Sequence, residues 1–516
     1  MVLLGSLIKR GLRLRKTINK VRKGRSASHW QRSTLVKLLK KAKGTQFGQA
    51  YNFEGILKSD FPRNSFQQTV PIFDYTRMHR EWWSKSLAGE QDVTWPGQIK
   101  YYALSSGTSG SASKYIPVTG SMIKSMRRTS VRQLLTLVNY NLPEDLFGKG
   151  VLVLGGSTDL EKVGNYYMGD LSGINQANMP FYTSPFYKPG KAIARQKDWN
   201  LKIDEIVKKA PNWDIGMITG VPAWNQIVLE RIIQTYRLNT IHDIWPNLSV
   251  FIYGGVAFEP YRTAFDRLLG KPIQYLETYL ASEGFLAYQS RKEVKGMELV
   301  LNNGIFMEFI PFNASNFNEE GELRPDAQRP LLIEEVRKNE EYAILISTNA
   351  GAWRYLIGDT IKFSSVEHRE IIITGRTKHF LSLCGEHLSV DNMSRAVELL
   401  AEQRGISFPE FTVAPMPSGH FFGHHWYIGC SESIPMDSQS LALQLDSILC
   451  MLNDDYKVER QHALKEVQVT LLPVTWFYEW LEIRGKIGAQ SKFPRVLRGE
   501  LLQAWGEFIL NKQRLA

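Results

Sequence analysis

Short apolar runs that end beside glycine and lead into helical stretches recur between residues 150 and 290 of the 516-residue chain. Three such runs are Val151–Leu154, Ile215–Ile218 and Leu248–Tyr253, and Ile273–Leu276 is a fourth apolar run of the same kind without the glycine. Continuous apolar strands alternating with helices are typical of an α/β domain with a buried, mainly parallel sheet. Ligands bind outside the carboxyl ends of such strands, which is where these glycine-rich loops lie.

The length of the chain predicts more than one domain, because single hydrophobic cores rarely grow to this size. A helix is expected over 28–43, because Leu35, Leu38, Leu39 and Ala42 recur at helical spacing and form one apolar face. A hairpin is expected over 298–313 with Asn303-Gly304 as its turn, and a meander of strands over 342–374. Further strands and a helix capped by Asp437 predict a small α+β domain after them. We therefore expect this domain order: a basic arm (1–27), a large α/β domain (28–375), a hinge (376–379) and a small mobile domain (380–516).

The net charge of +12 is concentrated at the N-terminus. Residues 1–25 carry nine lysines and arginines and no acid, so the rest of the chain is nearly balanced. This balance argues against a nucleic-acid-binding body, whereas the basic arm is either a solvated extension or a weak contact with an anionic membrane surface. Three scattered cysteines and the lack of a long apolar segment favour a cytoplasmic protein. The oligomeric state is not readable.

A run of small hydroxyl and glycine residues, Ser105 to Lys114, lies between two strand-like segments. Such residues allow a phosphate to approach the backbone closely, and a lysine adds positive charge. The run is not a P-loop kinase motif, because Lys114 is followed by tyrosine rather than serine or threonine. The alternative is a flexible surface linker. The residues expected to hold phosphates are Ser105, Ser106, Gly107, Thr108, Ser109 and Lys114.

Two later segments carry an aromatic ring and carboxylates near predicted strand ends. Tyr279 can cover a nucleotide base, and Glu283 can help to hold Mg²⁺, which prefers carboxylate and phosphate oxygens. Asp359 follows Gly358, and its carboxylate can accept hydrogen bonds from both hydroxyls of a ribose. The alternatives are a core tyrosine with a solvated glutamate, and an ordinary Gly-Asp turn.

Taken together, these three segments resemble the auxin-responsive (Gretchen Hagen three) family of acyl acid amido synthetases, in particular its bacterial members. That family belongs with the acyl-adenylate-forming, luciferase-like enzymes. The resemblance extends over nearly the whole chain and includes Trp95-Pro96-Gly97 and Gly220-Val221-Pro222-Ala223-Trp224. It implies that ATP and Mg²⁺ are used to adenylate a carboxylic acid, and that the acyl group is then passed to the amine of an amino acid.

The resemblance also assigns roles near the hinge and the C-terminus. Gly375-Arg376-Thr377-Lys378 is similar to the connection around which the small domain rotates between the two half-reactions. Lys492 lies in a stretch that resembles the tail carrying the adenylation lysine, and the alternative is a surface lysine. The chain departs from the plant members at His387, which stands where they carry a phosphate-contacting lysine. His387 is therefore a candidate only.

Two other functions remain open on the sequence. An acyl-CoA synthetase forms the same adenylate and differs only in its thiol acceptor. A membrane-surface binding protein would rely on the basic arm and carry a degenerate catalytic body. The candidate catalytic residues are Lys492, Lys114 and Glu283, and the candidate nucleotide-binding residues outside the run from Ser105 to Lys114 are Tyr279, Glu283, Asp359, Arg376 and His387.

Overall fold

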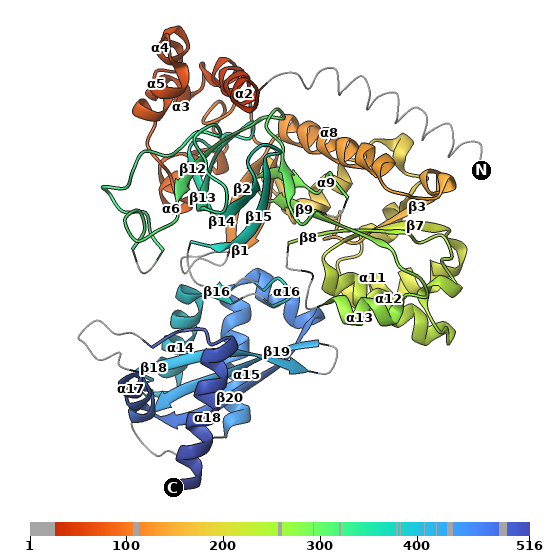
Figure 1. Cartoon of the computed structure of the whole chain (residues 1–516), viewed down its shortest axis with the longest axis vertical. Helices are drawn as coiled ribbons and strands as arrows, with labels where there is room; N and C mark the ends of the chain where they lie inside the picture. Colours follow the sequence, from red (N-terminus) through yellow and green to blue (C-terminus); the bar gives the residue numbers. More distant parts are fainter. Residues whose placement is uncertain are drawn as a thin grey trace. The chain divides into compact units, whose positions relative to one another are not determined.

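The computed structural model describes most of the chain in two compact units (Figure 1). The described residues are 26–106, 113–255, 258, 261–292, 294–318, 321–377, 380–381, 383–386, 388–406, 408–418, 421–430, 437–484 and 493–515. The first unit comprises the described residues of Met1–Leu104 and Tyr115–Thr377. The second comprises those of Ser105–Lys114 and Lys378–Ala516.

An eleven-stranded sheet is the centre of the first unit. Its order is β12-β13-β14-β15-β11-β10-β9-β8-β7-β3-β6. The strands from β9 to β6 pair in parallel, and those from β12 to β9 pair antiparallel. Their bounds are β3 Gly150–Val153, β6 Tyr187–Lys188, β7 Ile215–Gly220, β8 Val250–Gly254, β9 Gln274–Ala281, β10 Gly284–Tyr288, β11 Met297–Leu299, β12 Ile305–Pro311, β13 Glu341–Thr348, β14 Tyr355–Ser365 and β15 Glu370–Arg376.

The parallel half confirms the predicted α/β layering. Helix α8 (Gly120–Thr136) lies along one side of these strands, and α11 (Trp199–Lys209), α12 (Pro222–Tyr236) and α13 (Arg262–Leu268) lie on the other (Figure 1). Helix α12 begins with Pro222 in its first turn, where the missing N–H costs nothing. Helix α13 begins at Arg262.

Strands β13 to β15 form the predicted antiparallel meander, and β12 extends it by pairing with β13. Helix α2 (Ala27–Ala42) packs against β12. The predicted apolar face of α2 is buried, and Ser26 caps its first turn through its hydroxyl. The hairpin predicted over 298–313 is wrong. β12 pairs with β13 over seven residue pairs, whereas β11 lies between β10 and β15. Gly304 has φ +86°, as a turn residue can, but strand β12, which follows it, pairs with β13 and not with β11.

A second, four-stranded sheet has the order β2-β1-β5-β4. Its strands are β1 (Tyr101–Ser106), β2 (Ser113–Val118), β4 (Glu161–Val163) and β5 (Tyr166–Gly169). β1 pairs with β5 in parallel. Strand β1 therefore leads into the hydroxyl-glycine segment and strand β2 leads out of it, which agrees with the strand-like flanks predicted from the sequence.

The second unit is built on a three-stranded sheet in the order β18-β19-β20. Its strands are β18 (Glu410–Ser418), β19 (Phe421–Cys430) and β20 (Leu464–Pro473). Its main helices are α14 (Val390–Arg404), α15 (Ser438–Leu452), α16 (Asp454–His462), α17 (Val474–Ile483) and α18 (Gly499–Leu515). The carboxylate of Asp437 accepts hydrogen bonds from the Gln439 and Ser440 amides, so the predicted cap is confirmed. In the described part of the chain, no helix combines the length and apolarity needed to cross a bilayer.

Candidate active site

Tyr279 and Asp359 meet inside the first unit. The Tyr279 hydroxyl donates a hydrogen bond of 2.5 Å to Oδ2 of Asp359, 80 residues further along the chain. The sequence placed both residues at strand ends, and this was wrong. Tyr279 lies within β9, which pairs with β8 and β10 along both edges and therefore continues to Ala281. Asp359 lies in the first half of β14.

Arg376 completes this contact from the neighbouring strand. It is the register partner of Asp359 in the β14–β15 pairing, and its Nε lies 3.1 Å from Oδ1 of Asp359. Its Nη2 also donates to the Ile357 carbonyl at 3.0 Å. Gly358 has φ +90°, and a Cβ there would lie 3.3 Å from Nη2 of Arg376. Glycine therefore gives the strand its local shape and leaves room for the guanidinium.

Glu283 and Tyr355 lie close enough to share the electrostatics of this group. Burial, and then the charge of Asp359, raise the pKa of the Tyr279 hydroxyl well above its usual value. Burial, and then the charge of Glu283, do the same for Tyr355. Burial opposes the charge of Arg376, but Asp359 and Glu283 outweigh it and raise the pKa of Arg376. At neutral pH the group therefore combines protonated tyrosines and a cation with acidic side chains.

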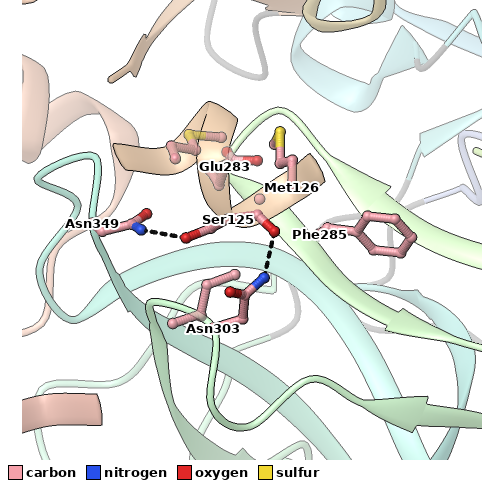
Figure 2. A pocket seen from close by; sticks show the side chains of 9 residues that line it. Ser125, Met126, Glu283, Phe285, Asn303 and Asn349 are labelled. Atoms are coloured by element: carbon pink, nitrogen blue, oxygen red, sulfur yellow. Dashed lines mark hydrogen bonds between the residues drawn. The ribbon is translucent and has the colours of Figure 1, made fainter. Parts of the chain in front are cut away.

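Glu283 and Gly284 also line a small pocket. Figure 2 shows Glu283 above Ser125, with Asn303 and Asn349 reaching Ser125 from below and from the side. Nδ2 of Asn349 donates to the Ser125 hydroxyl at 2.8 Å, and Nδ2 of Asn303 donates to the Ser125 carbonyl. The remaining lining residues are Met122, Met126, Gly284, Phe285 and Ile305. The pocket thus offers both oxygen acceptors and apolar surface beside the Tyr279–Asp359 contact.

The predicted phosphate-binding residues and Lys492 lie outside this group or outside the described residues. Lys114 is 7% exposed and lies on β2, and Ser105 is half-buried on β1. Ser106 ends β1. Three residues of the phosphate loop, Gly107, Thr108 and Ser109, lie outside the described residues, as do His387 and Lys492. The structure therefore brings together Tyr279, Glu283, Asp359 and Arg376.

Four neighbours of this group were missed from the sequence. Tyr355 stands four residues before Asp359, and the period of two in a strand would have placed both on one face. Ser125, Asn303 and Asn349 gave no such signal. They lie on α8 and on two loops of the first unit, and only the tertiary fold brings them beside Glu283.

Family models match most of the chain. The GH3 family N-terminal domain matches residues 19–164 and 157–273, the GH3 family central domain matches 298–372, and the GH3 family C-terminal domain matches 391–500. The matches follow one another in this order and include the Tyr355-to-Asp359 stretch. They agree with the resemblance found in the sequence.

Individual relatives and solved structures give the same result. Indole-3-acetic acid-amido synthetase GH3.4 of Arabidopsis thaliana is 21% identical over 547 residues, with 90% of this chain and 88% of the relative covered. Jasmonoyl-L-amino acid synthetase JAR6 of Nicotiana attenuata is 28% identical over 171 residues, which cover 32% of this chain and 28% of the relative.

Two solved structures share the fold over nearly the full length. A GH3.15 acyl acid amido synthetase superposes with a TM-score of 0.58 at 16% identity, covering 97% of this chain and 96% of the other. A 2-hydroxyisobutyryl-CoA ligase superposes with a TM-score of 0.59 at 13% identity, covering 95% and 93%. The predicted fold, a large α/β domain followed by a smaller α+β domain, is thereby confirmed. Because GH3 models match the chain from residue 19 to residue 500 with only short interruptions, the chain belongs to the GH3 family.

Proposed function

We propose that this protein is an ATP-dependent acyl acid–amido synthetase, a ligase that joins a carboxylic acid to the amine of an amino acid. The observation that carries the proposal is the joining of Tyr279, Asp359 and Arg376, with Glu283 beside them, in a chain matched by GH3 models along its length. The named relatives of the family are amido synthetases, which supports an amine acceptor.

The reaction has two steps. A carboxylate oxygen attacks the α-phosphorus of ATP, pyrophosphate leaves, and a mixed anhydride of the acid and AMP forms. The amine nitrogen then attacks the acyl carbon, loses a proton, and AMP leaves with the electron pair of the broken C–O bond. Catalysis of the first step depends mainly on positioning and on stabilising charge.

The residues of the first unit suit the nucleoside end of ATP. The Asp359 carboxylate is an acceptor-only group and can receive both ribose hydroxyls, while Tyr279 and Arg376 hold it in place. Mg²⁺ bound with ATP neutralises phosphate charge. The buried Glu283 carboxylate and the amide oxygens of Asn303 and Asn349 are hard oxygen ligands of the kind that this ion prefers, so the residues present fit it.

The phosphate end of ATP is assigned to residues outside this group. Lys114, Ser105 and Ser106, with Gly107, Thr108 and Ser109 of the loop, are proposed to contact the phosphates. Lys492 is proposed to stabilise charge where the carboxylate meets the α-phosphorus. We also propose that the segment 376–379 is a hinge around which the second unit rotates between the steps, and that His387 lies near the phosphates in one of the two states.

Exchange of labelled pyrophosphate into ATP with a panel of carboxylic acids tests the first step. We expect exchange with at least one acid, and its loss in Asp359→Ala and in Lys114→Ala, because each variant removes a proposed ATP contact. Tyr342→Phe is a matched control, since Tyr342 is a buried first-unit residue that bonds to Glu340. Exchange that persists unchanged in both alanine variants would refute the site assignment.

The acceptor is tested separately with the acid that supports exchange. We expect an amide product with an amino acid and no thioester with coenzyme A. The GH3 models and the named relatives favour the amine, whereas the likeness to a CoA ligase shows only a common fold. A thioester formed in place of an amide would overturn the proposed acceptor and keep the adenylation step.

A further inference from the structure

A fully buried ion pair lies where strand β14 begins. Arg354 is 4% exposed and Glu308, on β12, is 1% exposed. The guanidinium Nε lies 3.2 and 3.1 Å from the two carboxylate oxygens, and Nη2 lies 3.0 Å from Oε1. The guanidinium thus contacts the carboxylate through two nitrogens, which fixes the direction of the Arg354 side chain and neutralises the charge of Glu308.

The same pair is tied to the end of helix α5 (Pro62–Thr69). Nη1 of Arg354 donates to the carbonyls of Gln67 at 2.9 Å and Val70 at 2.6 Å. The side-chain amide of Gln67 donates to Oε1 of Glu308 at 2.9 Å. Arg354, Glu308 and Gln67 thus form one buried group, named here the β14 anchor, that joins β14, β12 and α5.

The backbone of Arg354 is held as firmly as its side chain. Its φ of +40° lies in the left-handed region, which costs a residue with a Cβ of the order of 1 kcal/mol. Its amide donates to the Ser347 hydroxyl at 2.9 Å, and its carbonyl accepts from the Phe73 amide at 2.9 Å. The Leu356 amide donates to the Phe73 carbonyl at 2.8 Å, so the chain is fixed on both sides of Tyr355.

These contacts matter for the candidate site because β14 carries Tyr355 and Asp359. The β13–β14 pairing shifts register between Ala343 and Leu345, and the β14–β15 pairing shifts between Thr360 and Ile361. A strand whose pairing is interrupted on both edges is not positioned by its hydrogen-bond ladder alone. We propose that the β14 anchor positions strand β14 so that the Asp359 carboxylate can bind the ribose of ATP. This inference rests on the proposed function.

Stability alone does not explain a buried ion pair of this kind. Removing two charges from water is costly, and apolar replacement of a whole buried pair is often neutral or stabilising. The anchor also keeps a strained backbone at Arg354. Both observations fit a group retained for positioning the site, since a small misplacement of a binding group can cost much of its effect.

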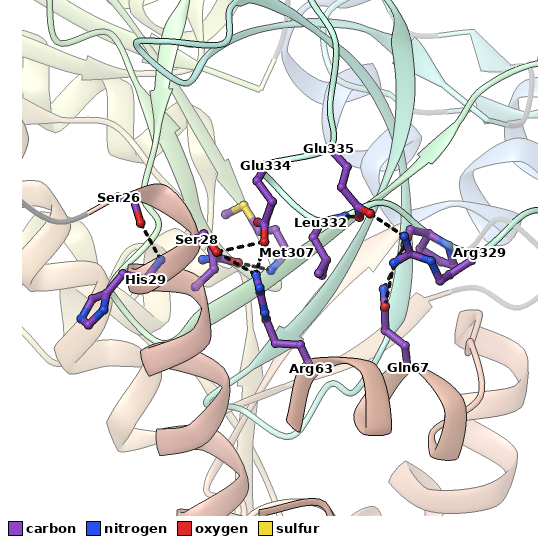
Figure 3. A network of polar contacts seen from close by, with 12 residues as sticks. Ser26, Ser28, His29, Arg63, Gln67, Met307, Arg329, Leu332, Glu334 and Glu335 are labelled. Atoms are coloured by element: carbon purple, nitrogen blue, oxygen red, sulfur yellow. Dashed lines mark hydrogen bonds and ion pairs between the residues drawn. The ribbon is translucent and has the colours of Figure 1, made fainter. Parts of the chain in front are cut away.

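A second polar cluster nearby offers a matched control. Figure 3 shows Gln67 reaching Arg329, which bonds to Glu335, while Arg63 reaches Ser28 on α2 and Glu334 on the loop between β12 and β13. Nη1 of Arg63 lies 2.6 Å from Oε1 of Glu334 and 3.1 Å from the Ser28 hydroxyl. Arg63 therefore ties α2 and α5 to the loop after β12, whereas Gln67 and Arg354 tie α5 to β14.

Calorimetric titration of the full chain with ATP alone tests the proposal without knowledge of the acid. In the double variant Glu308→Leu/Arg354→Met both charges are removed together, so no unpaired charge is left buried. The carbonyls of Gln67 and Val70 lose the donor Arg354, so the melting temperature is expected to fall by several degrees. The dissociation constant for ATP is expected to rise about tenfold, because Asp359 loses its fixed position. Gln67→Met keeps the ion pair and is expected to give a rise of about threefold. Arg63→Met is expected to leave ATP affinity unchanged.

The outcomes separate the two proposals. If wild-type protein does not bind ATP, the proposed function fails and the positioning role fails with it. If wild type binds ATP and both the double variant and Gln67→Met bind it equally well, the anchor is structural only and the inference is overturned. If the double variant does not fold, Gln67→Met decides: wild-type affinity overturns the inference, and weakened affinity beside an unchanged Arg63→Met supports it.

Discussion

The hydrogen bond from Tyr279 to Asp359 makes a quantitative prediction for the variant Tyr279→Phe. Tyr279 is 5% exposed and the Asp359 side chain is 15% exposed, so water replaces the lost hydroxyl poorly. A hydrogen bond to a charged group contributes roughly 1.5–3 kcal/mol, and Arg376 still pairs with the carboxylate after the change. We therefore expect the free energy of unfolding to fall by about 2 kcal/mol, which is roughly thirtyfold in the folding equilibrium.

Urea denaturation of the full-length protein measures this loss, with Tyr342→Phe as the control. Tyr342 is fully buried, but its hydroxyl donates to Glu340, whose side chain is 45% exposed and more easily solvated, and the hydroxyl accepts only a neutral hydrogen bond, from the Arg337 amide at 2.8 Å. The control is expected to lose about 1 kcal/mol. A Tyr279→Phe protein that loses no more stability than Tyr342→Phe would refute the reasoning.

The pH dependence of Tyr279→Phe follows from the same contact. The folded protein raises the pKa of Tyr279 above the ordinary value of 10.0, through burial first and Asp359 second. The protonated hydroxyl is therefore favoured in the folded state, and its contribution is complete below pH 10. Above pH 10 the unfolded tyrosine ionises, so the difference between wild type and Tyr279→Phe is expected to shrink.

Three further variants have expected outcomes. Burial alone would raise the pKa of Glu386, but its interaction with His424 and with backbone amides lowers this pKa from 4.5 to about 2. Glu386→Gln should therefore lower the free energy of unfolding, measured by urea denaturation at pH 7, by about 3 kcal/mol. This loss should become progressively smaller as the pH falls from 4.5 to 2. Burial lowers the pKa of Lys202 from 10.5 to about 8, so the charged side chain destabilises the folded state at pH 7. Lys202→Met should therefore stabilise the protein by about 2 kcal/mol at pH 7. This gain should vanish as the pH rises from 8 to 10.5, because over this range Lys202 is neutral in the folded protein but still protonated in the unfolded chain. Gly358→Ala should cost about 1–2 kcal/mol because of φ +90° and should weaken ATP binding in calorimetry by displacing Arg376. Unchanged thermal stability in Gly358→Ala, or equal denaturation curves for the other two variants and wild type, would contradict these expectations.

The elements that the sequence predicted well are those whose partners are local or whose pattern is strong. The apolar face of α2, the glycine-terminated strand β7 and the cap at Asp437 each depend on residues close together in the chain. The pairing of β12 with β13 depended on a choice between two distant partners. The turn residues Asn303-Gly304 favoured pairing with the strand just before them, β11. In the structure β12 pairs instead with β13, over seven residue pairs.

The candidate site shows the same division. The sequence selected Tyr279, Glu283, Asp359 and Arg376 through residue type and resemblance, and the structure brings these four together. Their places in the strands were wrong, because glycine beside an acid indicates a turn as readily as an irregular strand. The buried pair of Arg354 and Glu308 could not have been predicted, since a lone arginine and a lone glutamate 46 residues apart carry no pattern.

Strand β9 has a consequence for how the protein folds. One of its edges pairs in parallel with β8, and the other pairs antiparallel with β10. Strand β9 therefore joins the parallel half of the large sheet to the antiparallel half. Parallel pairing requires distant segments to meet and is intrinsically slow. Because Tyr279 lies on β9 and bonds to Asp359 on β14, the capacity to bind ATP should recover late during refolding, after most of the tryptophan fluorescence and of the helical circular-dichroism signal.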